Sequence, residues 1–80
     1  MDYTIAELKM VHQETKLTLN KSGAWYYVGF TYEKNGQKVF VHSRNDLSFE
    51  DALSIYQRIG EFMLKSLYSD EDKANWLQRY

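Results

Sequence analysis

Apolar and polar residues alternate through the middle of the chain. Two runs of β-branched and aromatic residues flank Asn35 and Gly36, a pair that tolerates the positive φ angles of a two-residue type I′ turn. Such a turn fixes the strand register and sets Phe30 opposite Val41. The pattern therefore predicts a β-hairpin over residues 25–42.

Another strand precedes this hairpin. Alternation predicts it over residues 15–20, and residues 21–24 (Lys-Ser-Gly-Ala) supply a four-residue turn that sets Leu19 opposite Tyr26. One face of the resulting three-stranded sheet then collects the apolar side chains, and a register slip by one residue would scatter them. The side chains expected on this core face are Leu17, Leu19, Tyr26, Val28, Phe30, Tyr32, Val39 and Val41.

The first residues of the chain have two interpretations. Thr4 with Glu7 three residues later has the form of a capping box, and it predicts a short helix that ends near Gln13. The competing interpretation is a strand from about Lys9, because the sequence that follows changes to period-two alternation.

Two more helices follow the sheet. Ser48 is the expected cap of a long amphipathic helix to about Leu67, in which Gly60 indicates close approach to the sheet or to another helix. Ser69 repeats the cap before a short final helix. The predicted fold class is α+β in the order α-β-β-β-α-α, a three-stranded antiparallel meander packed on one long helix with short helices at both ends.

The composition is that of one folded domain, residues 1–80, with 44% hydrophobic and 16% aromatic residues. The chain has no cysteine, which excludes disulfides, thiolate metal sites and a cysteine nucleophile, and favours a reducing compartment such as the cytoplasm. No apolar run approaches the roughly 18 residues of a membrane span, and the first ten residues do not resemble a secretion signal. We therefore expect no membrane partner.

The net charge of −1 gives no general attraction to nucleic acid or to an anionic membrane. The charge is nevertheless uneven. Residues 1–47 hold six Lys or Arg against five acidic residues, whereas residues 48–80 hold four against six. A basic surface would have to lie on the hairpin half of the chain.

The face of the sheet opposite the core is the candidate binding surface, because it interleaves aromatic rings with positive charge. Stacking platforms for single strands and hot spots of protein interfaces share this character. Two other interpretations stay open: the final helix covers this face with Trp76 and Tyr80, or the face is only a solvated side with long stems packed over rings. The candidate binding residues are Lys16, Trp25, Tyr27, Lys38, Phe40, His42 and Arg44.

Catalysis and metal binding have little support. Ser43, His42 and Asp46 are close in sequence, but neighbouring residues of a strand point to opposite faces, which would break a catalytic triad. The chain offers two histidines, at positions 12 and 42, without the further ligands of a zinc site. We expect no enzyme activity, no metal and no cofactor.

Residues 22 to 62 contain four motifs: Ser22-Gly23-x-Trp25, Val28-x-Phe30-x-Tyr32, Asn35-Gly36-Gln37-Lys38 and Phe49-x-x-Ala52. Taken together, they resemble the arm-type, AP2-like DNA-binding domain of phage and transposon integrases. That family is built on a three-stranded sheet, backed by one helix, that lies in the major groove. The resemblance implies that Lys16, Trp25, Tyr27, Lys38, Phe40 and Arg44 face DNA.

The expected order of elements in so small a chain also looks like that of some anti-CRISPR proteins of phages. That resemblance implies a non-enzymatic inhibitor that binds a host nuclease and blocks its nucleic-acid path. Near-neutral charge and an excess of aromatic residues fit a protein interface. The leading hypothesis is therefore a protein-binding module that inhibits a host protein, and the alternative is a DNA-binding or regulatory domain.

Overall fold

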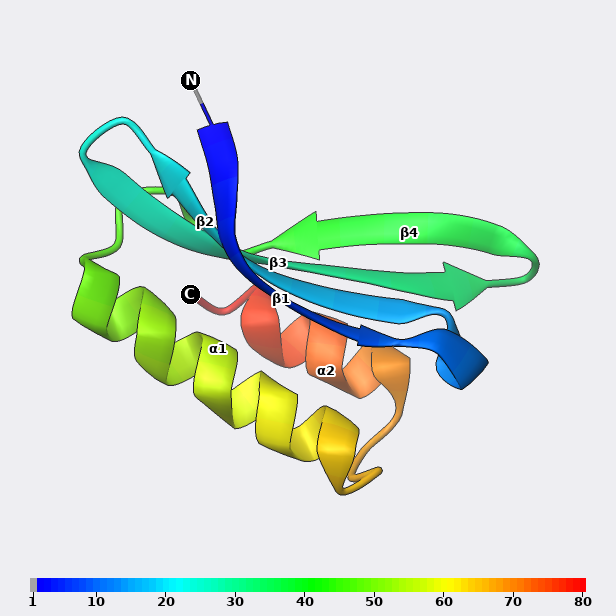
Figure 1. The fold of residues 1–80 in the computed structure, drawn as a ribbon. Helices are drawn as coiled ribbons and strands as arrows, with labels where there is room; N and C mark the ends of the chain where they lie inside the picture. Colours follow the sequence, from blue (N-terminus) through cyan, green and yellow to red (C-terminus); the bar gives the residue numbers. More distant parts are fainter. Residues whose placement is uncertain (1) are drawn as a thin grey trace.

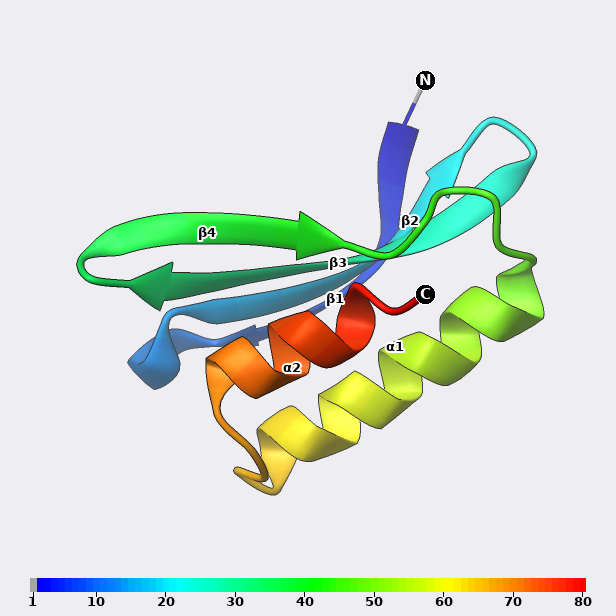
Figure 2. The ribbon, with the colours of Figure 1, turned by 180° about the vertical axis from the view of Figure 1, so that it is seen from behind.

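The computed structural model describes residues 2–80 as a four-stranded antiparallel sheet with two α-helices on one of its faces (Figure 1). The strands follow one another in the order β1-β2-β3-β4. Helix α1 packs on β2 and β3, whereas α2 packs on β3 and β4, beside α1 (Figure 2). In chain order the elements are β1 (Asp2–Met10), a 3-10 helix η1 (Val11–Gln13), β2 (Thr15–Ser22), β3 (Trp25–Lys34), β4 (Gln37–His42), α1 (Phe49–Leu64) and α2 (Asp70–Leu77).

The fold is α+β as predicted, but the predicted first helix is wrong. Residues 2–10 form the edge strand β1, which pairs antiparallel with β2. Thr4 is not a helix cap, since its hydroxyl donates to Asn20 Oδ1 on β2 at 2.9 Å. The competing strand interpretation was closer, although the strand begins at residue 2 and not near Lys9.

A β-bulge explains why the alternation of this strand was hidden. The register of β1 against β2 shifts between Thr4 and Ala6, so that Ile5 is the extra residue. An extra residue exchanges the two faces for everything on one side of it. The apolar residues at positions 5, 8 and 11 therefore mimic helical spacing, although Ile5 is exposed and Leu8 packs against the core.

The turn between β2 and β3 is tighter than predicted. It is a two-residue turn, Gly23-Ala24, with a positive φ of 62° at its first residue, as a type II′ turn requires. Leu19 consequently lies opposite Val28 and not opposite Tyr26, a shift of two residues. Because the side-chain period of a strand is also two, every side chain keeps its predicted face.

The second hairpin is confirmed in register and in turn. Phe30 lies opposite Val41, and both residues of the turn have positive φ, 54° at Asn35 and 78° at Gly36. The predicted core face is also confirmed. Its eight residues are either buried or packed against the buried cluster.

The caps of both predicted C-terminal helices are confirmed. Ser48 Oγ accepts from Asp51 N at 3.2 Å, and Ser69 Oγ accepts from Asp72 N at 3.0 Å. The long helix ends at Leu64, three residues earlier than predicted, and the chain then turns through residues with positive φ. These caps fix where each helix starts relative to the sheet.

The core lies between the sheet and the helices. Gly60 packs against the sheet, where an added Cβ would be 3.6 Å from Leu8 Cδ2 and 3.7 Å from Leu17 Cδ2. This confirms the predicted close approach. Within residues 2–80, neither helix has the length and hydropathy needed to cross a membrane. The remaining core residues come from both helices and from the β4–α1 loop: Leu47, Ala52, Ile55, Ile59, Met63, Ala74 and Leu77.

Candidate binding face of the sheet

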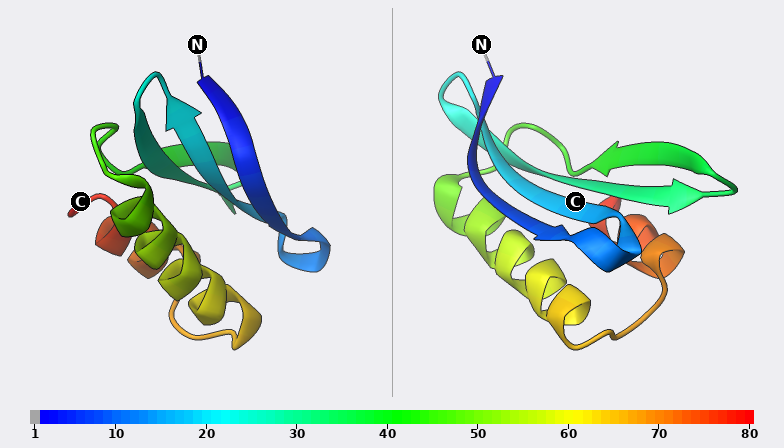
Figure 3. Two further views of the ribbon diagram at one scale, coloured as in Figure 1. Left: turned by 60° about the vertical axis from the view of Figure 1, so that its left-hand side comes forward. Right: turned by 45° about the vertical axis from the view of Figure 1, so that its right-hand side comes forward.

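Both helices lie on the core side of the sheet, so its other side, here called the open face, is uncovered (Figure 3). The interpretation in which the final helix covers this side is wrong. Trp76 instead packs beside Phe62 of α1, with ring centroids 5.9 Å apart, and beside Tyr80 at 4.8 Å. Trp76 and Tyr80 therefore contact each other on the core side of the molecule.

Four aromatic side chains on β3 and β4 form a ridge along the open face. His42 contacts both of its neighbours: its ring centroid is 5.8 Å from that of Tyr27, at an interplanar angle of 68°, and 5.8 Å from that of Phe40, at 31°. Trp25 continues the ridge along β3. Trp25 and Phe40 are 53% and 56% exposed. We call Trp25, Tyr27, Phe40 and His42 the aromatic ridge.

Beside the ridge, a polar network links strands β1, β2 and β3, and it reaches β3 through Thr18 Oγ1, which donates to Gly29 O at 3.5 Å. Thr4 Oγ1 donates to Asn20 Oδ1, and Asn20 Nδ2 donates to Thr18 Oγ1 at 2.9 Å. Thr18 and Asn20 are buried although they point to the open face. Buried polar networks whose hydrogen bonds are all formed make their surroundings rigid, so the strands that carry the aromatic ridge are held in place.

The phenol of Tyr27 is tied to the first strand. Its hydroxyl donates to Asp2 Oδ2 at 3.2 Å. Partial burial raises the pKa of Tyr27, and the hydrogen bond to Asp2 and the negative charge of Asp2 raise it further. Tyr27 therefore stays a neutral hydrogen-bond donor, held in one orientation.

Lysines gather at the end of the open face away from Trp25. The predicted residues Lys16 and Lys38 are both there and exposed, together with Lys9 of β1, which sequence reasoning missed. Lys9 was missed because its segment was predicted as a helix. The competing interpretation of a strand from about Lys9 was a partial signal, and the structure shows Lys9 paired with Lys16 of β2.

Two glutamates border the lysines. Glu33 on β3 lies opposite Lys38, and Glu14 lies beside it at the turn between β3 and β4. Hydrogen bonding to the Glu14 carboxyl group and the negative charge of Glu14 raise the pKa of Glu33, and the charge of Lys38 opposes the shift. The open face is therefore mixed in charge and not uniformly basic.

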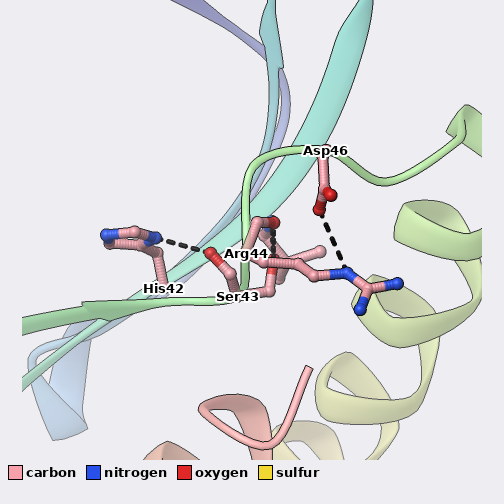
Figure 4. Close-up of polar contacts among 5 residues, drawn as sticks. His42, Ser43, Arg44 and Asp46 are labelled. Carbon is pink, nitrogen blue, oxygen red and sulfur yellow. Dashed lines mark hydrogen bonds and ion pairs between the residues drawn. The ribbon is translucent and has the colours of Figure 1, made fainter.

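Arg44 does not lie on the open face, contrary to the prediction. Strand β4 ends at His42, and Arg44 belongs to the following loop, where its Nε is 3.1 Å from Asp46 Oδ1 (Figure 4). Its backbone N–H donates to Tyr80 O at 2.6 Å, on the side of the helices. The loop then returns to the sheet at Leu47, which pairs with Tyr26.

Ser43 explains why the strand ends there. Its hydroxyl accepts from Val28 N and donates to Arg44 O, both at 3.0 Å. The side chain thus replaces a backbone acceptor of the sheet and lets the main chain leave. Ser43 is buried, whereas His42 is exposed on the open face, and the two side chains do not form a nucleophile and base pair.

Nothing in residues 2–80 assembles a metal site, because no three or more His, Asp or Glu side chains gather within reach of one ion. His12 lies beside the turn between β3 and β4, whereas His42 belongs to the aromatic ridge.

No family model matches this chain, and no similar protein was found among curated proteins or solved structures.

Proposed function

We propose that this protein is a non-enzymatic binding module that uses the aromatic ridge to bind another protein. The observation that carries this proposal is the exposure of Trp25 and Phe40 on a sheet face that neither helix covers. Large aromatic side chains contribute most of the binding free energy in many protein interfaces. Two such side chains on one uncovered sheet face therefore support the binding of a partner there.

Charge favours a protein over a nucleic acid as that partner. The sequence pI is about 6.1, whereas domains that bind nucleic acid through phosphate contacts have a pI above about 9. Acidic residues, including Asp2 and Glu33, share the open face with the lysines. An inhibitor of a host nuclease, acting in the cytoplasm, is the specific form of this role that the resemblance in architecture implies.

The test is affinity capture from a nuclease-treated lysate of the host, with three forms of the protein. The ridge variant carries Trp25→Ala and Phe40→Ala. The control variant carries Leu64→Ala and Tyr68→Ala, two residues that are more exposed than the ridge residues, at 65% each, but lie outside the sheet, at and after the end of α1.

We expect one protein to be captured by the wild type and by the control variant, and to bind the wild type in stoichiometric amounts when both are purified. The ridge variant should bind it at least a hundredfold more weakly, since hot-spot residues cost 2 kcal/mol or more each. Equal capture by the ridge variant would contradict the proposal. So would a partner that is captured from an untreated lysate but not from the nuclease-treated one.

A second candidate function is nucleic-acid binding, favoured by one observation: Lys16 and Lys38 share the open face with Trp25 and Phe40. Fluorescence anisotropy with labelled single-stranded and duplex DNA tests it. Binding should weaken by about one logarithmic unit per logarithmic unit of salt for each phosphate contact, and Lys16→Glu with Lys38→Glu should abolish it. Absence of binding at low salt would end this candidate.

A further inference from the structure

Three lysines from three strands surround one hollow at the end of the open face. Lys9 of β1, Lys16 of β2 and Lys38 of β4 line it, and its volume is about 340 Å³. Thr31 of β3 lies between the lysines of β2 and β4 and also lines the hollow. We call this the lysine hollow.

The arrangement is unfavourable for the protein alone. Lys9 and Lys16 lie directly opposite each other on paired strands, and like charges in that position are destabilising. None of the three lysines forms an ion pair with a residue in the range 2–80, whereas Lys34, Lys65 and Lys73 all do. The hollow thus concentrates three positive charges, which are offset only in part by Glu14 at its side and by Glu33 opposite Lys38.

We propose that the lysine hollow is a binding site for an oxyanion of the phosphate class. Lysine ammonium groups donate hydrogen bonds to phosphate oxygens as point charges, and the Thr31 hydroxyl can add a donor at the base of the hollow. A doubly charged group placed among three ammonium groups would replace their mutual repulsion by attraction.

The position of the lysines favours one compact phosphate over an extended strand. They gather at one end of the open face, and the other end of that face carries Asp2, over which a phosphodiester chain would have to run. Glu33 lies at the lysine end, opposite Lys38. Glu14 lines one side of the hollow, where it is engaged with Glu33. The site goes beyond the proposed protein binding and does not depend on it.

The test is a titration of the full chain with inorganic phosphate at neutral pH, in which NMR measures the chemical shifts of the backbone amides. Sodium chloride at matched ionic strength is the reference. We expect saturable shifts at Lys9, Lys16, Thr31 and Lys38 with phosphate alone. Shifts that follow ionic strength, or that spread over all lysines, would overturn the proposal.

Lys16→Gln and Lys21→Gln make a matched pair, since both remove one positive charge from β2. Lys21 points away from the open face and lies over the ring of Tyr26, 5.7 Å from its centroid. Lys16→Gln should weaken phosphate binding about tenfold, the loss of a hydrogen bond between charged groups, whereas Lys21→Gln should leave it within about twofold. Equal losses in both variants would show general charge attraction and would refute the site.

Thermal stability gives a second readout. At low salt without phosphate, Lys16→Gln should melt at a higher temperature than the wild type because it removes the repulsion from Lys9. With saturating phosphate the order should reverse, since the wild type binds phosphate about tenfold more tightly and is therefore stabilised more than the variant. An unchanged order would contradict the proposal.

The ridge variant separates this proposal from the proposed function. Trp25→Ala with Phe40→Ala should lose the protein partner and keep the phosphate response. If single-stranded DNA binds through the three lysines but inorganic phosphate does not, the compact phosphate site is wrong and the nucleic-acid candidate gains.

Discussion

The ring of Phe40 lies over the backbone of Gly29, so closely that a Cβ on residue 29 would be 2.8 Å from Phe40 Cε1. The same Cβ would be 2.9 Å from Thr18 Oγ1. Only glycine leaves room for the ring at this place. Because residue 29 has no side chain, the ring of Phe40 can rest on the backbone of β3, although the ring is more than half exposed.

Gly29→Ala should displace Phe40 and disturb the aromatic ridge. Overpacking of this kind costs about 1–3 kcal/mol, against a gain of about 0.5–1 kcal/mol from replacing glycine in a strand. We expect a net loss of stability in urea denaturation and weaker binding of the partner. Adding Phe40→Ala should restore part of the lost stability, and a double variant as unstable as Gly29→Ala alone would contradict the contact.

Phe30 and Phe40 offer a direct comparison of the two faces of the sheet. Phe30 is fully buried among core residues, whereas Phe40 is 56% exposed on the open face. Phe30→Ala should lower the free energy of unfolding by about 3–5 kcal/mol, as for buried phenylalanines in general. Phe40→Ala should cost less than about 1 kcal/mol. Similar losses from the two substitutions in chemical denaturation would mean that the open face is covered.

Thr15→Val should stabilise the protein. The Thr15 hydroxyl is buried and has no hydrogen-bond partner in the part of the chain that the structure describes. An unsatisfied buried polar group costs about 1–3 kcal/mol, and valine has nearly the same shape and the same preference for strands. We expect a higher midpoint of urea denaturation with an unchanged m-value. A loss of more than about 1 kcal/mol would show that the hydroxyl is bonded after all.

Glu33→Gln should change how stability depends on pH. The hydrogen bond to Glu14 raises the pKa of Glu33 above its ordinary value of 4.5, so the folded state holds a proton that the unfolded state releases first. Wild-type stability should therefore fall as pH rises from 4.5 through the raised pKa. Glutamine cannot lose a proton and removes this fall. The midpoint of urea denaturation, measured from pH 4 to pH 7 for the wild type and for Glu33→Gln, tests this prediction. If the two midpoints changed in parallel with pH, the interaction of Glu33 with Glu14 would be disproved.

Short-range signals in the sequence predicted the parts of the fold that they control. The Asn35-Gly36 turn fixes the register of β3 and β4, and the serines at 48 and 69 start both helices. The core face could be predicted even with the wrong turn before β3, because a shift of two residues leaves each side chain on its face.

The errors come from features that change the period or the direction of the chain. The bulge at Ile5 breaks the alternation of β1 and makes a strand look helical. Ser43 replaces a backbone acceptor with its own hydroxyl, so that β4 ends before Arg44. Neither effect can be read from residue types, because both depend on partners in other strands.

The side of the sheet on which α2 packs also could not be predicted from the sequence. The sequence allowed Trp76 to cover either face, and the structure places it on the core side, in contact with Phe62 of α1. That placement leaves the open face uncovered, so the residues of the aromatic ridge are accessible to a partner. Alternation in the sequence could show that these residues share a face, but not that the face is uncovered.

The most direct test of the central claim is the quenching of Trp25 fluorescence by acrylamide in a Trp76→Phe variant, which leaves Trp25 as the one tryptophan of the chain. We predict red-shifted emission and strong quenching for the free protein, with shielding of Trp25 when the partner binds. Blue-shifted emission that resists acrylamide in the free monomer would show that the open face is covered and would contradict the account.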